Sequence, residues 1–210
     1  MLNVLDLFVR PGTAEVVISS NAIVQIPMVF SPEIAGLASL NIGCGLRPLP
    51  NFVNCDVAAA PGVDRVFDAQ KKWPFANDSA KAIYVSHVIE HLSNPLGFFD
   101  EAWRVLHSHG SMVARVPHVQ HRHSWADPTH LRLWSPEAFY WLQEWSPQTW
   151  SHCPGFMTRD KFWAIEIVAH VLAKDKDWAN RFPLRPFLGW AIDNLWNICL
   201  EMVVWMRPKR

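Results

Sequence analysis

The stretch LNIGCG at residues 40–45 decides the fold, because it reads as a short strand that ends in two closely spaced glycines. Glycine has no Cβ atom, so the backbone can turn sharply there and lie close to a ligand. A second short apolar run ends in Asp56, a third runs from Val63 to Phe67 and ends in Asp68, and a fourth covers Ala82 to Ser86. This order predicts a parallel sheet whose carboxyl edge carries a binding site.

A helix and a fifth strand are predicted after the fourth run. Asn94 is a favourable capping residue, and Pro95 suits the first position of a helix. Ser111 to Val116, closed by Pro117, is expected to form the fifth strand. The apolar residues that recur at helical spacing, and are therefore expected to face the sheet, are Leu96, Phe99, Trp103 and Leu106.

Further strand signals lie near both ends of the chain. Ala14 to Ile18 and Ile23 to Phe30 carry β-branched residues around a turn-like Ser-Ser-Asn, which predicts a hairpin or flap in an extension over residues 1–36. Residues 37–210 are expected to form the main domain. Late strand candidates at Phe162 to Leu172 and Leu200 to Arg207 are separated by a helix-like stretch from Pro186 to Ile198, and together they predict an antiparallel hairpin at one sheet edge.

The composition bounds the function. Half of the 210 residues are hydrophobic, which is enough for one core. Lysine and arginine number 19, as do aspartate and glutamate, so binding of nucleic acid by charge alone is not favoured. The four cysteines form no Cys-x-x-Cys pair and no secretory leader is evident, so a cytoplasmic setting is expected. The apolar stretch from Phe187 to Met206 contains two carboxylates and is not expected to span a membrane.

A polar loop rich in histidine follows the fifth strand at residues 118–130, and a helix opened by Ser135-Pro136 comes next. Three interpretations of the loop stay open: a polar surface facing solvent or substrate, a general base, or a metal site. The candidates for a base are His118, Asp127 and His130. No metal site is predicted, because the ligand types follow no spacing typical of one. The twelve tryptophans fit either an acceptor pocket or ordinary packing.

These segments resemble the small class I S-adenosylmethionine-dependent methyltransferases. The resemblance covers about residues 38–117 and rests on LNIGCG, NCDV, VDRVFDA, WPFANDSAKAIYVSHVIEHL and EAWRVLHSHGSMVARVP. The later runs SWADPTHLRLWSPEAF and EMVVWMRPK are similar to segments of one subgroup. The resemblance implies an α/β fold, with a Rossmann-like, seven-stranded, mostly parallel sheet, helices on both faces and the late hairpin at an edge. Arg47 stands where many members have a third glycine, and a short proline-containing loop replaces their first helix.

The resemblance also implies how S-adenosylmethionine would be held. Asp56 would accept hydrogen bonds from the ribose hydroxyls, Asp68 with Ala69 would lie by the adenine, and the turn at Ser86 would border the sulfonium. The residues expected to bind this cofactor are Asn41, Gly43, Cys44, Gly45, Arg47, Asp56, Val57, Asp68, Ala69, Ser86, His87 and His91.

The expected activity is methyl transfer to a small metabolite or sugar, with residues 118–160 inserted on the acceptor side. Holding donor and acceptor at near-attack distance can provide much of the rate. Three alternatives stay open: a noncatalytic cofactor-binding or assembly protein, a methyltransferase of nucleic-acid bases, and a nicotinamide-dependent reductase. The second is demoted, because Ser86-His87-Val88-Ile89 stands where a base-flipping tetrapeptide would follow the fourth strand.

Overall fold

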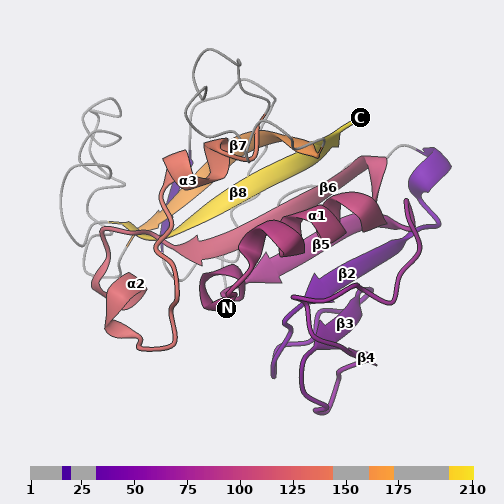
Figure 1. The fold of residues 1–210 in the computed structure, drawn as a ribbon, viewed down its shortest axis with the longest axis horizontal. Coiled ribbons are helices and arrows are strands. Elements are labelled where there is room, and N and C mark those ends of the chain that lie inside the picture. The colour runs from indigo at the N-terminus through magenta and orange to yellow at the C-terminus, as the bar shows by residue number, and fades with distance from the viewer. Residues whose placement is uncertain (1–15, 20–31, 144–160, 173–198) are drawn as a thin grey trace.

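The computed structural model describes residues 16–19, 32–143, 161–172 and 199–210. They form one eight-stranded sheet in the order β1-β7-β8-β6-β5-β2-β3-β4 (Figure 1). No helix within these ranges has the length and apolar character needed to cross a membrane.

Five parallel strands make the half of the sheet that was predicted with most detail. They are β2 (Ala38–Ile42), β3 (Val53–Asp56), β4 (Arg65–Val66), β5 (Ala80–Ser86) and β6 (Leu106–Pro117). Within this group of five, adjacent strands pair in parallel, so their carboxyl ends meet at one edge. The prediction of these strands in this order is confirmed, although β4 is only two residues long and β6 begins at Leu106, five residues before the expected start.

The other part of the sheet is antiparallel and contains one strand more than expected. β7 (Phe162–Leu172) pairs antiparallel with β8 (Cys199–Lys209), and β8 pairs antiparallel with β6. The predicted late antiparallel pair is therefore confirmed, but it does not form the sheet edge. β1 (Val16–Ser19) pairs in parallel with β7 and becomes the eighth, outermost strand. The first half of the predicted hairpin is thus a strand of the main sheet. Its second half, predicted at 23–30, and the helix predicted at 186–198 both lie outside the described residues.

Short helical segments connect the strands. They are η1 (Pro32–Ile34), η2 (Ile89–His91), α1 (Pro95–Val105), α2 (Arg122–Ala126) and α3 (Pro136–Tyr140). The predicted cap of α1 is confirmed, because the side chain of Asn94 accepts a hydrogen bond from the Gly97 amide at 3.0 Å. The helix predicted to begin after Ser135 is present as α3. In Figure 1, α2 lies beyond the carboxyl end of β6.

The buried face of α1 differs from the predicted stripe. Its buried residues are Pro95, Phe98, Phe99, Ala102 and Val105, whereas Leu96 and Trp103 are only partly buried and Leu106 already belongs to β6. The helix ends a residue earlier than expected because the chain turns directly into a long strand, with no loop at Gly110.

Aromatic packing explains where several tryptophans go. Phe99 lies at the centre of a cluster of edge-on ring contacts, which are the favourable geometry for aromatic pairs. Its partners are Phe98, Trp134, Phe139 and Trp163. Trp73, Trp134 and Trp163 are buried in the core, so these three tryptophans serve packing.

A charged pair on α1 fixes the loop that follows β4. Arg104 binds Glu101 through two nitrogens and also donates to the carbonyls of Trp73 and Phe75. Glu101 in turn accepts from the Trp73 amide at 2.8 Å. These bonds hold the segment that follows Asp68, at Trp73 to Phe75, against α1 and so support the carboxyl edge of the sheet.

Candidate functional site

The glycine turn after β2 has a conformation that requires glycine. Gly43 and Gly45 have φ angles of +70° and +52°, in the left-handed region that side chains with a Cβ disfavour. The amides of Gly43 and Cys44 both donate to the carbonyl of Cys55, at 2.8 and 3.0 Å. A Cβ atom on Gly43 would stand 2.2 Å from a methyl carbon of Val88. The turn is therefore packed against the segment that follows β5.

Asp56, at the end of β3, closes the turn from the other side. Its Oδ2 accepts a hydrogen bond from the Gly45 amide at 2.8 Å, and its Oδ1 accepts one from the Ala58 amide at 3.3 Å. Each carboxylate oxygen can accept more than one hydrogen bond. The aspartate is thus oriented by backbone donors and retains acceptor capacity for a ligand.

A cavity of about 340 Å³ opens at this edge of the sheet, within the range of about 300–1,000 Å³ typical of ligand pockets. It is bounded by the glycine turn, by the ends of β3 and β4, and by the segment after β5. Gln70 helps to shape it, because its Oε1 accepts from the amide and hydroxyl of Ser93 at 2.8 and 2.7 Å. The predicted cofactor residues that line the cavity are Gly43, Asp56, Val57, Asp68, Ala69, His87 and His91.

The other five predicted cofactor residues do not line this cavity. Asn41 is buried and donates to Asn54 Oδ1 at 2.8 Å, and the same oxygen accepts from the Leu49 amide at 2.7 Å. Asn41 thereby supports the short loop after the glycine turn. Gly45 and Arg47 are exposed on that loop, Ser86 ends β5, and Cys44 is buried.

The two cysteines near the turn are unsuited to nucleophilic chemistry. Burial raises the pKa of the Cys44 thiol, and Asp56 adds to the effect. Burial also raises the pKa of Cys55 to about 12. Since the thiolate is the reactive form, both side chains stay protonated near neutral pH.

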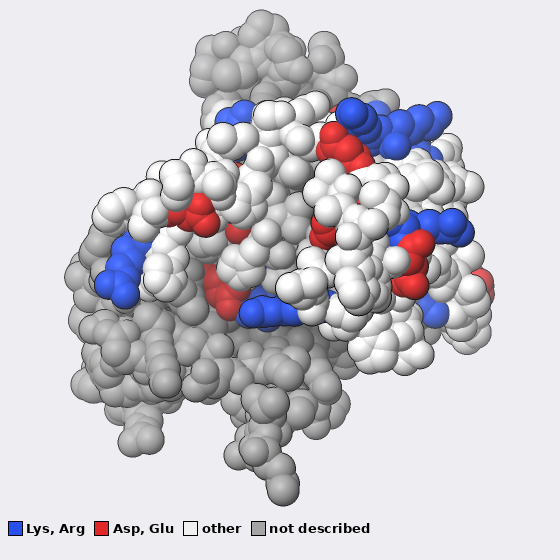
Figure 2. All heavy atoms as spheres, turned by 90° about the horizontal axis from the view of Figure 1, so that it is seen from below, with Lys and Arg blue, Asp and Glu red and all other residues white. Residues whose placement is uncertain are grey.

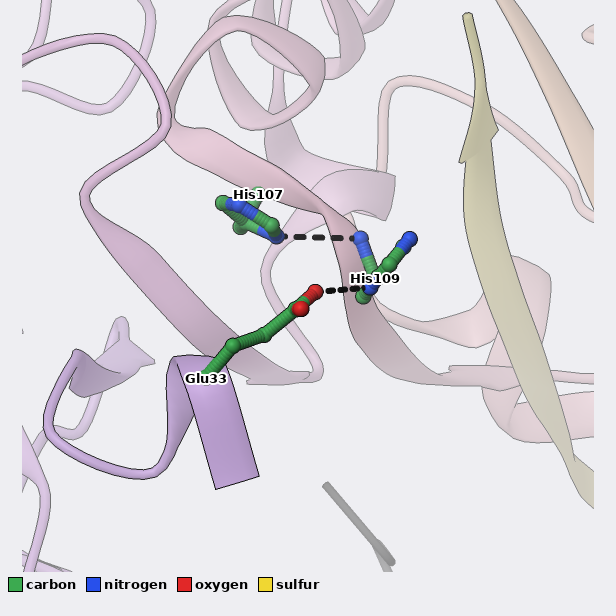
Figure 3. A group of neighbouring side chains, drawn as sticks. All are labelled: Glu33, His107 and His109. Carbon is green, nitrogen blue, oxygen red and sulfur yellow. Dashed lines mark hydrogen bonds and ion pairs between the residues drawn. The ribbon is translucent and has the colours of Figure 1, made fainter. Parts of the chain in front are cut away.

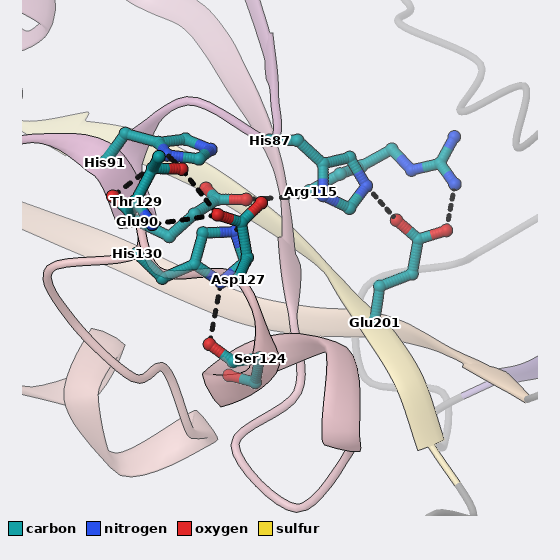
Figure 4. Close-up of polar contacts among 9 residues, drawn as sticks. All are labelled: His87, Glu90, His91, Arg115, Ser124, Asp127, Thr129, His130 and Glu201. Carbon is teal, nitrogen blue, oxygen red and sulfur yellow. Dashed lines mark hydrogen bonds and ion pairs between the residues drawn. The ribbon is translucent and has the colours of Figure 1, made fainter.

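His87 occupies a strained position at the carboxyl end of β5 and joins a network of charged groups. Its φ angle is +54°, which is uncommon for a residue other than glycine. Its Nε2 lies 2.8 Å from Glu201 Oε2, and its Nδ1 lies 3.3 Å from Glu90 Oε1. Glu201 also forms an ion pair with Arg115. Figure 4 shows His87 between the two carboxylates.

This network sets the protonation of His87. Partial burial of the ring, whose side chain is 47% exposed, opposes the charged form, but the neighbouring carboxylates of Glu201 and Glu90 outweigh it and raise the pKa of His87 to about 9. Glu201 is also buried, which favours its neutral form, yet His87 and Arg115 hold its pKa below the ordinary value. His87 is therefore a cation near neutral pH and is not available as a base.

The His87 network predicts a fall in stability at alkaline pH. The folded state binds the His87 proton more tightly than the unfolded state, whose pKa is near 6.5. The extra stability is thus complete below pH 6.5 and is lost as the pH rises through about 9. Urea unfolding at a series of pH values should show this decline in the free energy of unfolding, and a chelator keeps metal ions away from the imidazoles during the measurement. Glu201→Gln, which leaves Glu90 beside His87, should flatten this decline, and an equal slope in both proteins would contradict the role of Glu201 in raising the pKa of His87.

A second cavity of about 660 Å³ adjoins the first. His87 and His91 line both, so these two side chains form the border between them. The second cavity is otherwise lined by the end of β6, by Glu201 and by the histidine-rich loop, including His123, Asp127 and His130. The two cavities meet just after β5, at His87, and at His91, the last residue of η2.

The three candidate bases are placed differently. Asp127 and His130 line the second cavity, and His130 Nε2 lies 3.8 Å from Asp127 Oδ2. Asp127 accepts from the hydroxyl and amide of Thr129, which lowers its pKa. His118 is buried, lines neither cavity, and bridges to Trp134.

Sequence reasoning missed Glu90, Arg115 and Glu201. Arg115 and Glu201 are charged residues within otherwise apolar stretches of β6 and β8, which are neighbours in the sheet. Charged residues on central strands are rarely buried unless they are paired. A charged residue within an apolar strand was therefore the available signal that Arg115 and Glu201 are paired. The sequence does not show that β6 and β8, which are far apart along the chain, lie side by side.

Comparison with known proteins agrees with this geometry. Residues 40–114, a little over a third of the chain, match the family described as Methyltransferase domain. No curated protein matches the chain. A solved S-adenosylmethionine-dependent methyltransferase from Archaeoglobus fulgidus is similar at 15% identity and a TM-score of 0.49, over 84% of this chain and 88% of the other.

Two further solved structures show similarity at a comparable level. Phosphoethanolamine N-methyltransferase 2 of Haemonchus contortus, in complex with S-adenosyl-L-methionine, has 13% identity and a TM-score of 0.48, over 85% of this chain and 50% of the other. The cyclase SpnF has 15% identity and a TM-score of 0.47, over 82% and 75%. These likenesses assign no acceptor. Residues 40–114 therefore carry the sequence pattern of a methyltransferase domain, and the parallel strands β2 to β6 lie within or overlap these residues.

Proposed function

We propose that the protein transfers a methyl group from S-adenosylmethionine to a small-molecule acceptor. The observation that carries this proposal is the pair of adjoining cavities, which share His87 and His91 as their border. One cavity is formed by the glycine turn and the strand ends of the methyltransferase domain, and the other by the histidine-rich loop. Two compartments that meet at one border suit a donor and an acceptor.

The first cavity fits the cofactor by its donors, acceptors and close packing. Asp56 and Asp68 end β3 and follow β4 on neighbouring strands, so they would accept from the ribose hydroxyls and from the adenine amino group. Gly43 would bring backbone against the amino-acid tail, since no side chain fits there. Bound S-adenosylmethionine supplies an electrophilic methyl group.

The second cavity would hold the acceptor and receive its proton. The residues at the border fix the distance between the two compartments, and such positioning is a large part of the rate in a displacement reaction. A proton from an acceptor hydroxyl or ammonium group would go to Asp127 or His130, which line this cavity. The hydrogen bonds from Thr129 hold the Asp127 carboxylate in place for this role.

A compact acceptor is favoured over a nucleic acid. The chain has equal numbers of acidic and basic residues. On the face in Figure 2, the charged side chains of the described residues are interspersed, and no broad surface of one sign runs across it. A track for a polyanion would instead require clustered cations.

Replacing Asp56 with alanine should weaken cofactor binding by tenfold or more. Each hydrogen bond to a charged group contributes roughly 1.5–3 kcal/mol, and about 1.4 kcal/mol corresponds to a factor of ten. Equilibrium titration with S-adenosylhomocysteine measures the change. Asp64→Ala is the matched control, because Asp64 likewise accepts from a backbone amide, that of Asn54, but lies outside the cavity. Equal effects of the two substitutions would contradict the role of Asp56.

The activity itself is tested by transfer of a radiolabelled methyl group, measured beside a binding titration. Cell extracts separated into metabolite, nucleic-acid and protein fractions serve as acceptors, and label in the metabolite fraction is expected. Label in the nucleic-acid fraction would overturn the choice of acceptor. Cofactor binding without label in any fraction would favour a noncatalytic binding or assembly protein, and a change in nicotinamide fluorescence on mixing would favour a reductase.

A further inference from the structure

Three side chains with metal-binding atoms converge beside the border of the two cavities, where His91 lines both cavities, His130 lines the second and Glu90 lies buried behind them. Glu90 and His91 come from η2, and His130 comes from the loop after α2. One ligand atom from each lies within 4.8 Å of the others. The rings of His91 and His130 meet edge to face with their centres 4.7 Å apart. Figure 4 shows the three side chains together, beside Asp127.

The second nitrogen of each histidine is already oriented. His91 Nδ1 lies 3.2 Å from the Thr129 carbonyl oxygen, and His130 Nδ1 lies 2.7 Å from the Ser124 carbonyl oxygen. A carbonyl only accepts, so both Nδ1 atoms carry a proton, and in the neutral imidazole each Nε2 atom then has a lone pair available to a metal ion. An imidazole whose far nitrogen donates to a carbonyl is the arrangement found in protein metal sites.

Glu90 gives an independent reason to expect a cation here. Its side chain is 1% exposed, and among the described residues no hydrogen bond reaches either carboxylate oxygen. The His87 imidazolium, 3.3 Å from Oε1, supplies one neighbouring charge. A buried carboxylate without hydrogen bonds is costly, and a metal ion would remove that cost by direct coordination.

We infer that Glu90, His91 and His130 bind a divalent transition-metal ion, Zn²⁺ by ligand preference, at the border between the two cavities. Two imidazole nitrogens and one carboxylate suit Zn²⁺, whereas Mg²⁺ and Ca²⁺ prefer oxygen ligands. Three protein ligands leave a coordination position open, as in metal sites that contact a substrate. The spacing of the histidine-rich loop alone could not indicate this site, because two of its ligands come from η2.

A second group of similar residues provides an internal comparison. Glu33, His107 and His109 also place ligand atoms within 4.8 Å of one another (Figure 3), and none of the three lines either cavity. Glu33 and His109 are exposed and form an ion pair with each other, and His107 Nδ1 accepts from the His109 amide at 3.1 Å. This second group contains no buried carboxylate that lacks hydrogen bonds.

The position of the metal site suggests its use, and this step rests on the proposed function. A cation bound by the triad of Glu90, His91 and His130 would use its open coordination position to contact an acceptor oxygen in the second cavity, and it would lower the pKa of that hydroxyl group. With His130 coordinated, Asp127 would remain to take the proton. The acceptor would then be an oxygen nucleophile, an alcohol or a phenol.

Metal binding can be tested without any acceptor. The full chain, stripped with a chelator, is titrated with Zn²⁺ by calorimetry and with Co²⁺ by visible absorption, whose bands report nitrogen and oxygen ligands. Wild type and the double variant His107→Ala/His109→Ala should both bind at the triad. His130→Ala should lose this site, and Thr129→Val, which removes a hydroxyl 3.1 Å from His91 Nδ1, should weaken it about tenfold.

The outcomes separate the two groups of residues. Binding that disappears only in His107→Ala/His109→Ala, or the lack of any binding to wild type, would overturn the inference. Circular dichroism shows whether His130→Ala folds, and Glu90→Gln, which keeps the shape of the side chain, gives a second test through the same site. A metal site confirmed in a protein that transfers no methyl group would leave the inference standing and refute the proposed function alone.

Discussion

Gly43→Ala should destabilise the protein by roughly 2–5 kcal/mol and strongly reduce cofactor binding. A residue with a side chain in the left-handed region costs roughly 1–2 kcal/mol, and overpacking adds roughly 1–3 kcal/mol. Both terms apply, because Gly43 has a φ of +70° and its added Cβ would stand 2.2 Å from Val88 Cγ2. Val88 lines the first cavity, so its displacement would change the shape of the pocket. Urea unfolding and a titration with S-adenosylhomocysteine measure the two effects.

Two further variants separate backbone strain from steric contact. Gly45 also has a positive φ, +52°, but a Cβ there would meet no atom within 4 Å. Gly45→Ala should therefore show the backbone cost alone. The double variant Gly43→Ala/Val88→Ala removes the methyl group that the new Cβ would meet, and it should recover part of the lost affinity. Equal losses in Gly43→Ala and Gly45→Ala would contradict the packing of the turn.

Glu201→Ala should destabilise the protein by about 3 kcal/mol. Removing one partner of a buried ion pair typically costs 3–5 kcal/mol, because the other charge is left without compensation. Glu201 is 4% exposed and binds both Arg115 and His87. The Arg115 side chain is 18% exposed, and because this partial contact with water would reduce the cost of leaving its charge unpaired, we expect the lower end of that range. Urea unfolding at neutral pH measures the loss.

The Glu201 substitution has a second readout and a matched control. The pKa of His87, about 9 in the wild type, should fall in Glu201→Ala, and NMR titration of the imidazole protons follows it. The double variant Glu201→Leu/Arg115→Met replaces both charges with apolar groups and should recover much of the stability. A loss below about 1 kcal/mol in Glu201→Ala would show that the pair contributes no more than an exposed one.

The parallel half of the sheet could be predicted from the sequence because each of its signals is local. The glycine turn, the aspartates at strand ends and the capping Asn94 are read within a few residues, and their order fixes the topology. The edge strand β1 was not predicted as part of the sheet, because its partner β7 lies about 150 residues later in the chain. The buried face of α1 was also predicted incompletely, since two of its residues, Phe98 and Phe99, both face the core.

The candidate site was predictable to a similar extent. Residues that follow directly from strand ends, such as Asp56 and Asp68, could be proposed from their place after an apolar run. Pairs of residues that meet only through tertiary contact could not be proposed from the sequence. Glu201 reaches His87 across 114 positions, and His91 meets His130 only because the loop after β6 returns to η2.

The structure of the protein with bound S-adenosylhomocysteine tests most directly whether the first cavity holds the cofactor. The product should lie in this cavity, with its ribose hydroxyls within hydrogen-bond distance of Asp56 and its sulfur toward His87 and His91. A product bound at another place, or a cavity that holds only solvent at saturating concentration, would contradict this placement.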